Sequence, residues 1–374
     1  MKDAAGLYLH VPFCKTKCPY CDFYSITADS LIPAWVNAVE KEVLFYTDVF
    51  SSFDTLYLGG GTPSILPDAV LGELIEYLFC RFSFSPRPEI TVEINPDDVT
   101  QEKLLFLKGL GFNRISLGAQ SFCDAELHIL KRRHNARQTA AALDLISETD
   151  FPNRSIDLIC GLPGQTEAAW MSSLEKAVTY HPEHISCYQL TICKHTPFGR
   201  AAVRGSITVP DEEAQRSFFL RTARFLEGCG YVHYEVSNYA RSSTFTCSHN
   251  RKYWDHTPYL GLGPSAHSFC GNRRWWNVKS VARSCAMIDR NTAPVAGTET
   301  LSSDQVYLES LALGFRTARG VDRTLIDQRS NAEIILRDLQ KAGLILIHGE
   351  RVVPTREGML VADSLPLLFV SNKE

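Results

Sequence analysis

The sequence predicts an α/β protein: a partial (β/α)6 barrel followed by a small C-terminal helical and winged domain. Over about the first 230 residues, short apolar runs alternate with longer amphipathic stretches, which is the pattern of strands alternating with helices. Parallel strands need such crossovers, so six strand–helix pairs indicate one parallel sheet. Six pairs are too few for a closed barrel of eight strands, and they favour an open, curved sheet.

The expected elements follow one another without a repeat or a low-complexity tract. The six expected strands, rich in Val, Ile, Leu, Thr or Tyr, are Gly6–Phe13, Phe53–Leu58, Glu89–Asn95, Arg114–Gln120, Arg154–Cys160 and His184–Ile192. The six expected helices are Ile32–Tyr46, Pro67–Phe79, Thr100–Leu110, Ala136–Ser147, Thr166–Tyr180 and Asp211–Glu227. The last of these helices begins with three acids after a proline, which suits a helix start.

The pattern changes twice after the sixth pair, so we expect three regions. Residues 1–230 form the barrel, residues 231–300 an aromatic-rich covering segment, and residues 301–374 a winged-helix-like domain. The expected elements of the last region are the helices Asp304–Leu313 and Asn331–Ala342 and the strands Leu344–His348 and Arg351–Pro354. A packing role is favoured for this domain over nucleic-acid recognition, because the chain is acidic overall.

The composition excludes several classes of protein. The chain has 374 residues, of which 45% are hydrophobic and 21% charged, and its formal net charge is -4. Such a balance gives no basic signal for a nucleic-acid partner, and we expect none. No uncharged apolar run approaches the roughly 18 residues of a membrane-spanning helix. Twelve cysteines without a secretory signal pattern indicate a reducing compartment, so a cytoplasmic location is expected.

Three cysteines with the spacing Cys-x3-Cys-x2-Cys follow the first expected strand: Cys14, Cys18 and Cys21. No second Cys-x2-Cys pair lies at the distance typical of a four-cysteine zinc site. Three thiolates can hold three irons of a [4Fe–4S] cluster. The fourth iron would then be open to the nitrogen and oxygen atoms of a small molecule. A zinc knuckle or a group of reduced structural thiols is the alternative interpretation.

Three consecutive glycines, the last two being Gly60 and Gly61, lie next to Thr62 directly after the second expected strand. Because they lack side chains, their backbone amides and carbonyls can approach a ligand closely. The stretch lacks both the Lys-Ser/Thr pair of a phosphate loop and the spacing of a dinucleotide site. A tight turn without a ligand is the alternative interpretation.

The cysteine motif resembles the signature of the radical SAM superfamily, whose members hold S-adenosylmethionine (SAM) on the open iron and cleave it reductively to a radical. The resemblance narrows to the anaerobic coproporphyrinogen III oxidase-like family and covers nearly the whole chain. It is carried by residues 8–14, 59–63, 116–122, 156–166 and 249–254.

This resemblance implies a set of SAM contacts. They are Tyr8, Tyr20, Gly60, Gly61, Thr62, Glu93, Gln120, Arg132 and Asp157. The residue types suit the ligand, because carboxylates can bind ribose hydroxyls or the ammonium group and a guanidinium can bind the SAM carboxylate. A core or surface ion pair is the alternative for any one of these residues taken alone.

The segment His249-Asn250-x-x-Tyr253-Trp254 is similar to a motif associated with heme in the heme-chaperone branch of the same family. The similarity implies that His249, Tyr253 and Trp254 contact heme. A heme needs an axial ligand such as His, Cys, Met or Tyr and a large apolar surface for its macrocycle. A structural histidine beside aromatic residues is the alternative.

Two departures favour a heme chaperone over an oxygen-independent coproporphyrinogen III oxidase. Phe23 stands where the oxidase pattern has a further cysteine, and the first cysteine is already residue 14. We therefore expect heme binding and transfer to acceptor apo-hemoproteins, including acceptors at a membrane surface, and an electron donor. In this interpretation the cluster and SAM form a redox-sensitive structural or regulatory unit that does not require turnover. An iron–sulfur gene regulator is disfavoured by the acidic balance.

Overall fold

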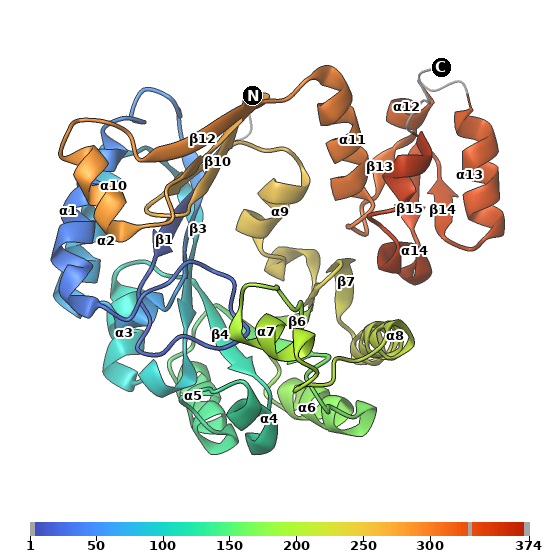
Figure 1. Cartoon of the computed structure of the whole chain (residues 1–374), viewed down its shortest axis with the longest axis horizontal. Helices are drawn as coiled ribbons and strands as arrows, with labels where there is room; N and C mark the ends of the chain where they lie inside the picture. The colour runs from blue at the N-terminus through green and yellow to red at the C-terminus, as the bar shows by residue number, and fades with distance from the viewer. Residues whose placement is uncertain (1–3, 328–330, 370–374) are drawn as a thin grey trace.

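The computed structural model describes residues 4–327 and 331–369. Its main feature is one curved, open sheet (Figure 1), in which the described strands follow the order β12-β11-β10-β9-β1-β2-β3-β4-β5-β6-β8-β7. Strands β1 to β6 run parallel, as the six strand–helix pairs predict. Almost every residue of β1 is buried, which fits a parallel strand covered on both faces. The predicted α/β fold is confirmed.

The structure gives the following bounds. The strands are β1 (Ala5–Val11), β2 (Phe53–Gly60), β3 (Phe84–Ile94), β4 (Arg114–Gln120), β5 (Asn153–Cys160), β6 (His184–Gln189), β7 (Val232–Glu235), β8 (Asn238–Ala240), β9 (Tyr259–Leu262), β10 (His267–Cys270), β11 (Arg273–Asn277), β12 (Val295–Thr300), β13 (Val321–Asp322), β14 (Ile345–His348) and β15 (Arg351–Pro354). The α-helices are α1 (Ile32–Val43), α2 (Asp68–Arg81), α3 (Gln101–Gly109), α4 (Asp124–Ile129), α5 (Ala136–Glu148), α6 (Glu167–Thr179), α7 (Pro197–Val203), α8 (Glu212–Gly228), α9 (Ser248–Trp254), α10 (Val281–Ile288), α11 (Ser303–Gly314), α12 (Arg323–Ile326), α13 (Ala332–Lys341) and α14 (Arg356–Leu360).

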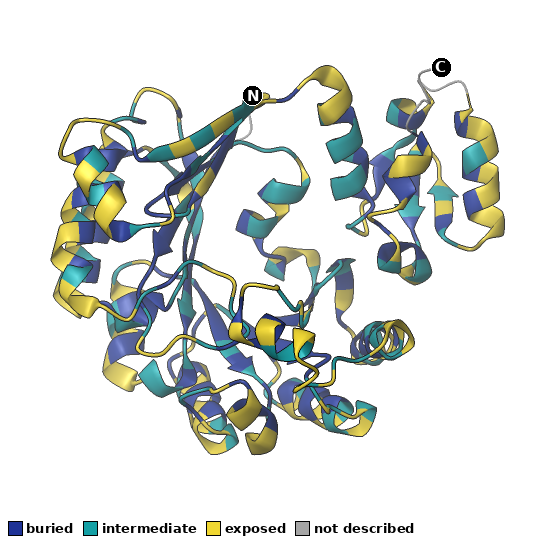
Figure 2. Cartoon of the chain, in the orientation of Figure 1, coloured by how far each residue is buried: buried dark blue, intermediate teal, exposed yellow. Residues whose placement is uncertain are grey.

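The crossover helices α1, α2, α3, α5 and α6 cover the convex face of the sheet, and α9 lies on its open, concave side (Figure 1). The convex face therefore carries the main core, in which Trp35 of α1 and Trp170 of α6 are almost completely buried. Figure 2 shows the same division, with buried strands behind helices that expose only their outer faces. Asn135 caps α5 with a reciprocal bond to Gln138, a local signal that fixes the start of this helix.

The segment from residue 231 to 300 differs from the expected covering layer. Strands β7 and β8 extend the sheet antiparallel beside β6, while β9 pairs parallel with β1 and continues antiparallel into β10, β11 and β12. These strands have three to six residues, too short for the alternation pattern to separate them from loops. The aromatic-rich segment thus adds strands to both edges of the barrel.

The C-terminal region has a core of its own. Leu311 of α11 and Leu336 of α13 pack with Val352 of β15 in a cluster distinct from the main core. A three-stranded sheet, β13-β15-β14, completes this region. The expected helices and the last two expected strands are all present within one or two residues.

One buried hydrogen bond between α6 and α8 offers a test of the outer helical layer. Trp170 Nε1 donates to Thr222 Oγ1 at 2.7 Å inside the core. We expect Thr222→Val to lower the free energy of unfolding by about 1–3 kcal/mol, because the indole N–H would stay buried without an acceptor. Chemical denaturation of the variant measures this loss.

Thr139→Val is the matched control for this substitution. Thr139 is equally buried, but its hydroxyl bonds only the carbonyl of Asn135 within its own helix. We expect a smaller loss from this variant. Equal losses would contradict the role given to the bond between α6 and α8.

Candidate functional site

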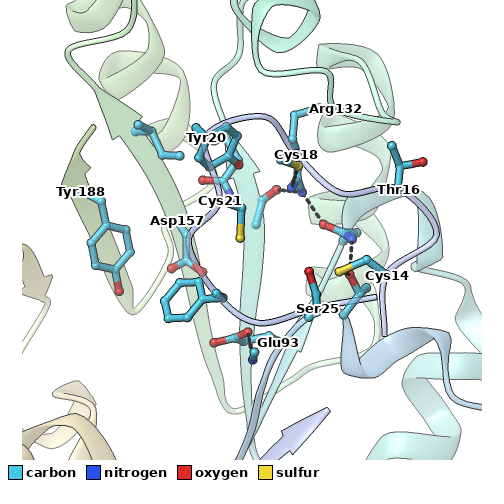
Figure 3. Close-up of a pocket in the computed structure, with 18 of the residues that line it drawn as sticks. Cys14, Thr16, Cys18, Tyr20, Cys21, Ser25, Glu93, Arg132, Asp157 and Tyr188 are labelled. Carbon is cyan, nitrogen blue, oxygen red and sulfur yellow. Dashed lines mark hydrogen bonds between the residues drawn. The ribbon is translucent and has the colours of Figure 1, made fainter. Parts of the chain in front are cut away.

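A cavity of about 480 Å³ opens at the carboxyl ends of the parallel strands, where barrel folds place their ligand sites. Figure 3 draws part of its lining, with Cys14 and Cys18 on one side of the view, Tyr188 on the other, and Cys21, Asp157 and Glu93 between them. The predicted residues that line it are Cys14, Cys18, Cys21, Tyr20, Gly60, Gly61, Thr62, Glu93, Gln120, Arg132 and Asp157. The folded chain thus brings together residues that are up to 143 positions apart in the sequence (Cys14 to Asp157).

The loop that carries the cysteines is held at several points. Ile26 closes it against the end of β1, because its backbone N–H donates to Pro12 O at 2.7 Å and its carbonyl accepts from Cys14 N at 2.9 Å. Lys15 forms an ion pair with Asp98 at 2.8 Å. These contacts fix the path of the loop before any ligand binds.

The cysteine side chains have surroundings suited to thiolate ligands. The Thr62 hydroxyl donates to Cys14 Sγ at 3.5 Å, and the Arg132 guanidinium donates to Cys18 Sγ at 3.6 Å. Burial raises the pKa of the Cys21 thiol to about 11, so iron would replace a proton at this sulfur. Within the described residues, no three His, Cys, Asp or Glu side chains converge on a single metal ion. A cluster does not need such convergence, because each thiolate bonds a different iron.

The glycines at the end of β2 are required because other groups of the chain approach them closely. Gly61 N donates to Val11 O and Thr62 N to Phe13 O, both at 2.8 Å. A Cβ atom at Gly61 would lie 2.6 Å from Phe13 O. Gly60 has a φ of 107°, and a Cβ there would meet the His10 ring at 2.4 Å. The triple glycine therefore lets β2 approach the cysteine loop, besides forming part of the cavity wall.

Glu93 and Asp157 place two carboxyl groups in the cavity. Glu93 accepts from Tyr57 Oη at 2.9 Å and from Gly60 N at 3.1 Å, while Ser116 donates to Asp157 at 2.7 Å. Burial raises the pKa of both carboxyl groups, that of Glu93 to about 7 with a further contribution from the Asp157 charge. Two buried acids, one of which has its proton affinity raised by the other, form a site that favours a cationic ligand group.

Arg132 is one of three basic residues that line the cavity, beside Lys131 and Arg133. Its guanidinium donates to Asn95 Oδ1 and to Gly118 O, the latter at 2.9 Å. Its Nε atom is buried without a hydrogen-bond partner among the described residues. Such an orphaned donor in a ligand-sized cavity fits a ligand carboxylate. The chemistry of the cavity thus suits a zwitterion with a further positive charge, as SAM is.

Tyr8 and His249 lie behind this cavity. Tyr8 is hydrogen-bonded to His10 Nδ1 at 3.1 Å, and His249 stacks on Tyr57 with ring centroids 5.1 Å apart. Both ring nitrogens of His249 have partners, Thr55 Oγ1 at 2.8 Å and Tyr253 Oη at 2.9 Å. Burial lowers the pKa of His249 to about 3, so the imidazole is neutral.

Tyr253 and Trp254 line a second cavity, of about 500 Å³, between α9, the β7–β8 edge and α14. Tyr188 at the end of β6 lines both cavities. Tyr188 and Tyr57 are functional candidates that no sequence motif indicated. For Tyr57 a signal was available, because it alternates with Gly59 along β2 and therefore shares the face that leads into the glycines.

A three-cysteine loop after the first strand of an open parallel barrel defines the class of radical SAM proteins. Residues 8–177 match the model of the radical SAM superfamily, and residues 301–361 match that of the HemN C-terminal domain. In structure, the chain is similar to coproporphyrinogen III oxidase (HemN) from Escherichia coli, with a TM-score of 0.84 at 24% identity over 98% of this chain and 90% of the other. That likeness supports the fold.

Sequence relatives narrow the class. The chain is 35% identical to the heme chaperone HemW of Mycobacterium tuberculosis strain H37Rv over 96% of this chain and 93% of that protein. It is 31% identical to heme chaperone HemW of Bacillus subtilis over 98% of each. The chain therefore belongs to the HemW family within the radical SAM superfamily. The resemblance read from the motifs is confirmed.

A further observation concerns membranes. Across residues 4–327 and 331–369, the helices are all too short or too polar to cross a bilayer.

The cluster assignment can be tested by replacing thiols. We expect Cys14→Ala, Cys18→Ala and Cys21→Ala each to abolish the broad iron–sulfur absorbance after anaerobic reconstitution, because one iron would lose its thiolate. Cys80→Ala, an exposed thiol on α2, should keep it, as should a change at the exposed Phe23. Full iron and sulfide content in the Cys18→Ala protein would contradict the three-ligand assignment.

The raised pKa of Glu93 predicts how SAM binding depends on pH. SAM is cationic at its sulfonium and ammonium groups, so its binding favours the ionised form of Glu93. Because the pKa of this group is about 7 without ligand, the affinity should fall as the pH is lowered from 7.5 to 5.5, approaching about tenfold per pH unit. Equilibrium binding of SAM to the reconstituted protein measures this slope.

Two variants test whether the pH dependence of SAM affinity comes from Glu93. Glu93→Gln should bind SAM more weakly and with a flatter pH profile. Glu42→Gln is the control, because the pKa of Glu42 is also raised to about 7 by burial but the residue bonds Gly263 and Asn277 away from the cavity. A wild-type affinity that does not change over this pH range would rule out the role of Glu93.

Proposed function

We propose that this protein is a heme chaperone that binds heme and passes it to acceptor hemoproteins. The observation that carries the proposal is the match to HemW relatives along nearly the whole chain. The fold resembles that of an oxidase, but Phe23 lines the cluster cavity where the oxidase pattern has a further cysteine. The HemW relatives and Phe23 favour the chaperone over the oxidase.

In this proposal the first cavity holds the cluster and SAM. Cys14, Cys18 and Cys21 are the iron ligands, and the acids Glu93 and Asp157 bind the cationic groups or the ribose of SAM. The fit rests on the buried acid pair and on the orphaned Arg132 donor. When bound, the cluster supplies an electron that can cleave the sulfonium. Heme transfer does not require turnover of SAM.

The residues of the heme motif have two different roles in this proposal. Tyr253 and Trp254 face the second cavity and supply aromatic surface for the macrocycle. His249 holds the Tyr253 hydroxyl from behind and contributes through it. Tyr8, whose ring lies tilted beside that of Tyr57, contributes to the SAM site through Tyr57.

Further parts of the proposal concern organisation and partners. We assign residues 1–230 to the barrel, 231–300 to the segment that extends the sheet, and 301–374 to a packing domain with its own core. We propose that the acceptors include proteins at a membrane surface. An electron donor reduces the cluster. Nucleic acid is not a partner in this proposal. Free thiols throughout the described chain support a reducing, cytoplasmic setting.

The test is a heme titration of the reconstituted protein followed by transfer to an apo-hemoprotein. We expect a Soret band that saturates and then moves to the acceptor. Trp254→Ala should weaken heme binding about tenfold or more, because a buried aromatic contact contributes roughly 1.5–3 kcal/mol. The control is Trp276→Ala, since Trp276 lies on β11 against His267.

The same preparation should form no protoporphyrinogen from coproporphyrinogen. Robust decarboxylation of coproporphyrinogen would show that the protein is an oxidase and contradict the chaperone proposal. Failure of the wild-type protein to bind heme would refute the proposed function outright.

A further inference from the structure

The second cavity has a wall that belongs to the C-terminal region, outside the heme motif. Met359 and Leu360 of α14 line it together with Tyr253 and Trp254 of α9, and Arg316 is a further lining residue. Its volume of about 500 Å³ lies within the roughly 300–1,000 Å³ typical of ligand sites. The cavity therefore combines aromatic and apolar walls with one cationic group.

Arg316 is held in place by the sheet edge. Val236 N donates to Arg316 O at 2.9 Å, and Ala318 N donates to Tyr234 O at 3.0 Å. Residues 316–318 thus run antiparallel beside β7, with a bridge between Glu235 and Thr317. The Arg316 side chain lines the cavity, and its guanidinium carbon lies 5.9 Å from the centre of the Trp254 ring.

Two residues that line this cavity each have a buried polar atom without a partner among the described residues. Asn238 is 4% exposed, and its Oδ1 has no hydrogen bond within the described part of the chain. The same holds for Trp254 Nε1. Buried polar groups are nearly always paired in folded proteins, so these atoms point to a bound molecule.

We infer that the second cavity is the heme site and that Arg316 binds a propionate carboxylate of the heme. The inference rests on the proposed function and adds the C-terminal region to the site. The macrocycle lies between the aromatic residues of α9 and the apolar residues of α14. A guanidinium is the usual partner for a carboxylate at the edge of such a site.

Two acids of the cavity, Asp363 and Glu235, compete with a ligand carboxylate for Arg316. Arg316 is paired with Asp363, whose Oδ1 accepts from Nε at 2.8 Å, but the Asp363 side chain is 73% exposed. An exposed pair of this kind is weak. The propionate can therefore replace Asp363 on the guanidinium. Glu235, the other acid in the cavity, is neutral over part of the physiological range, because burial raises its pKa to about 7.

The experiment compares heme with its dimethyl ester, in which both propionates are masked. We expect Arg316→Leu to weaken heme binding about tenfold, which is about 1.4 kcal/mol, and to leave binding of the ester within about twofold of wild type. Arg316→Lys, which keeps the charge, should recover part of the loss. Asp363→Asn should bind heme about two- to fivefold more tightly, since the competing charge is gone.

Arg323→Leu is the matched control. Arg323 is also an ion-paired arginine of the C-terminal region, bonded to Asp327 and Glu333, and should bind heme as the wild type does. Equal weakening of heme and ester by Arg316→Leu would overturn the carboxylate assignment, as would unchanged heme affinity in a wild type that binds heme. A wild type that binds neither ligand would instead refute the proposed function.

Discussion

The arrangement of the first cavity depends on a backbone contact between the end of β2 and the end of β1. Only glycine fits at residue 61, because its Cβ would collide with the carbonyls of Val11 and Phe13. That contact brings the Thr62 hydroxyl to the Cys14 sulfur and directs the Gly60 amide at the Glu93 carboxylate. The cysteine loop and the Glu93 carboxylate are therefore positioned by the same few atoms, so a change at Gly61 would disturb both.

The two cavities are joined by a layer of aromatic side chains. Glu93 at the first cavity accepts from Tyr57, the Tyr57 ring stacks on His249, and His249 bonds the Tyr253 hydroxyl at the second cavity. Tyr188 forms a further shared wall. Rings packed in this way have little freedom to shift independently. Three side chains, those of Tyr57, His249 and Tyr253, thus connect the Glu93 carboxyl group to the wall of the second cavity.

The sequence was sufficient where a local pattern coincides with a tertiary role. The alternation of apolar runs located the six parallel strands, and the cysteine spacing located the loop that faces the cavity. It was insufficient where the role depends on a distant partner. The orientation of His249 is set by a hydrogen bond to Thr55 of β2, which is 194 residues away. The sequence around the two residues carries no pattern that predicts this bond. The short strands β7 to β12 were missed because they are stabilised by their neighbours in the sheet rather than by their own periodicity.

The C-terminal region illustrates how a module with its own core becomes part of a site. The core around Leu311 and Val352 is typical of a separately packed domain. The chain after α11 nevertheless pairs with the edge of β7 through Arg316 and Ala318. This pairing covers an edge strand that would otherwise expose its amides. The same backbone bonds place a guanidinium beside Trp254. The same short segment therefore covers the sheet edge and contributes a residue to the second cavity. Both contacts attach the C-terminal region to the barrel.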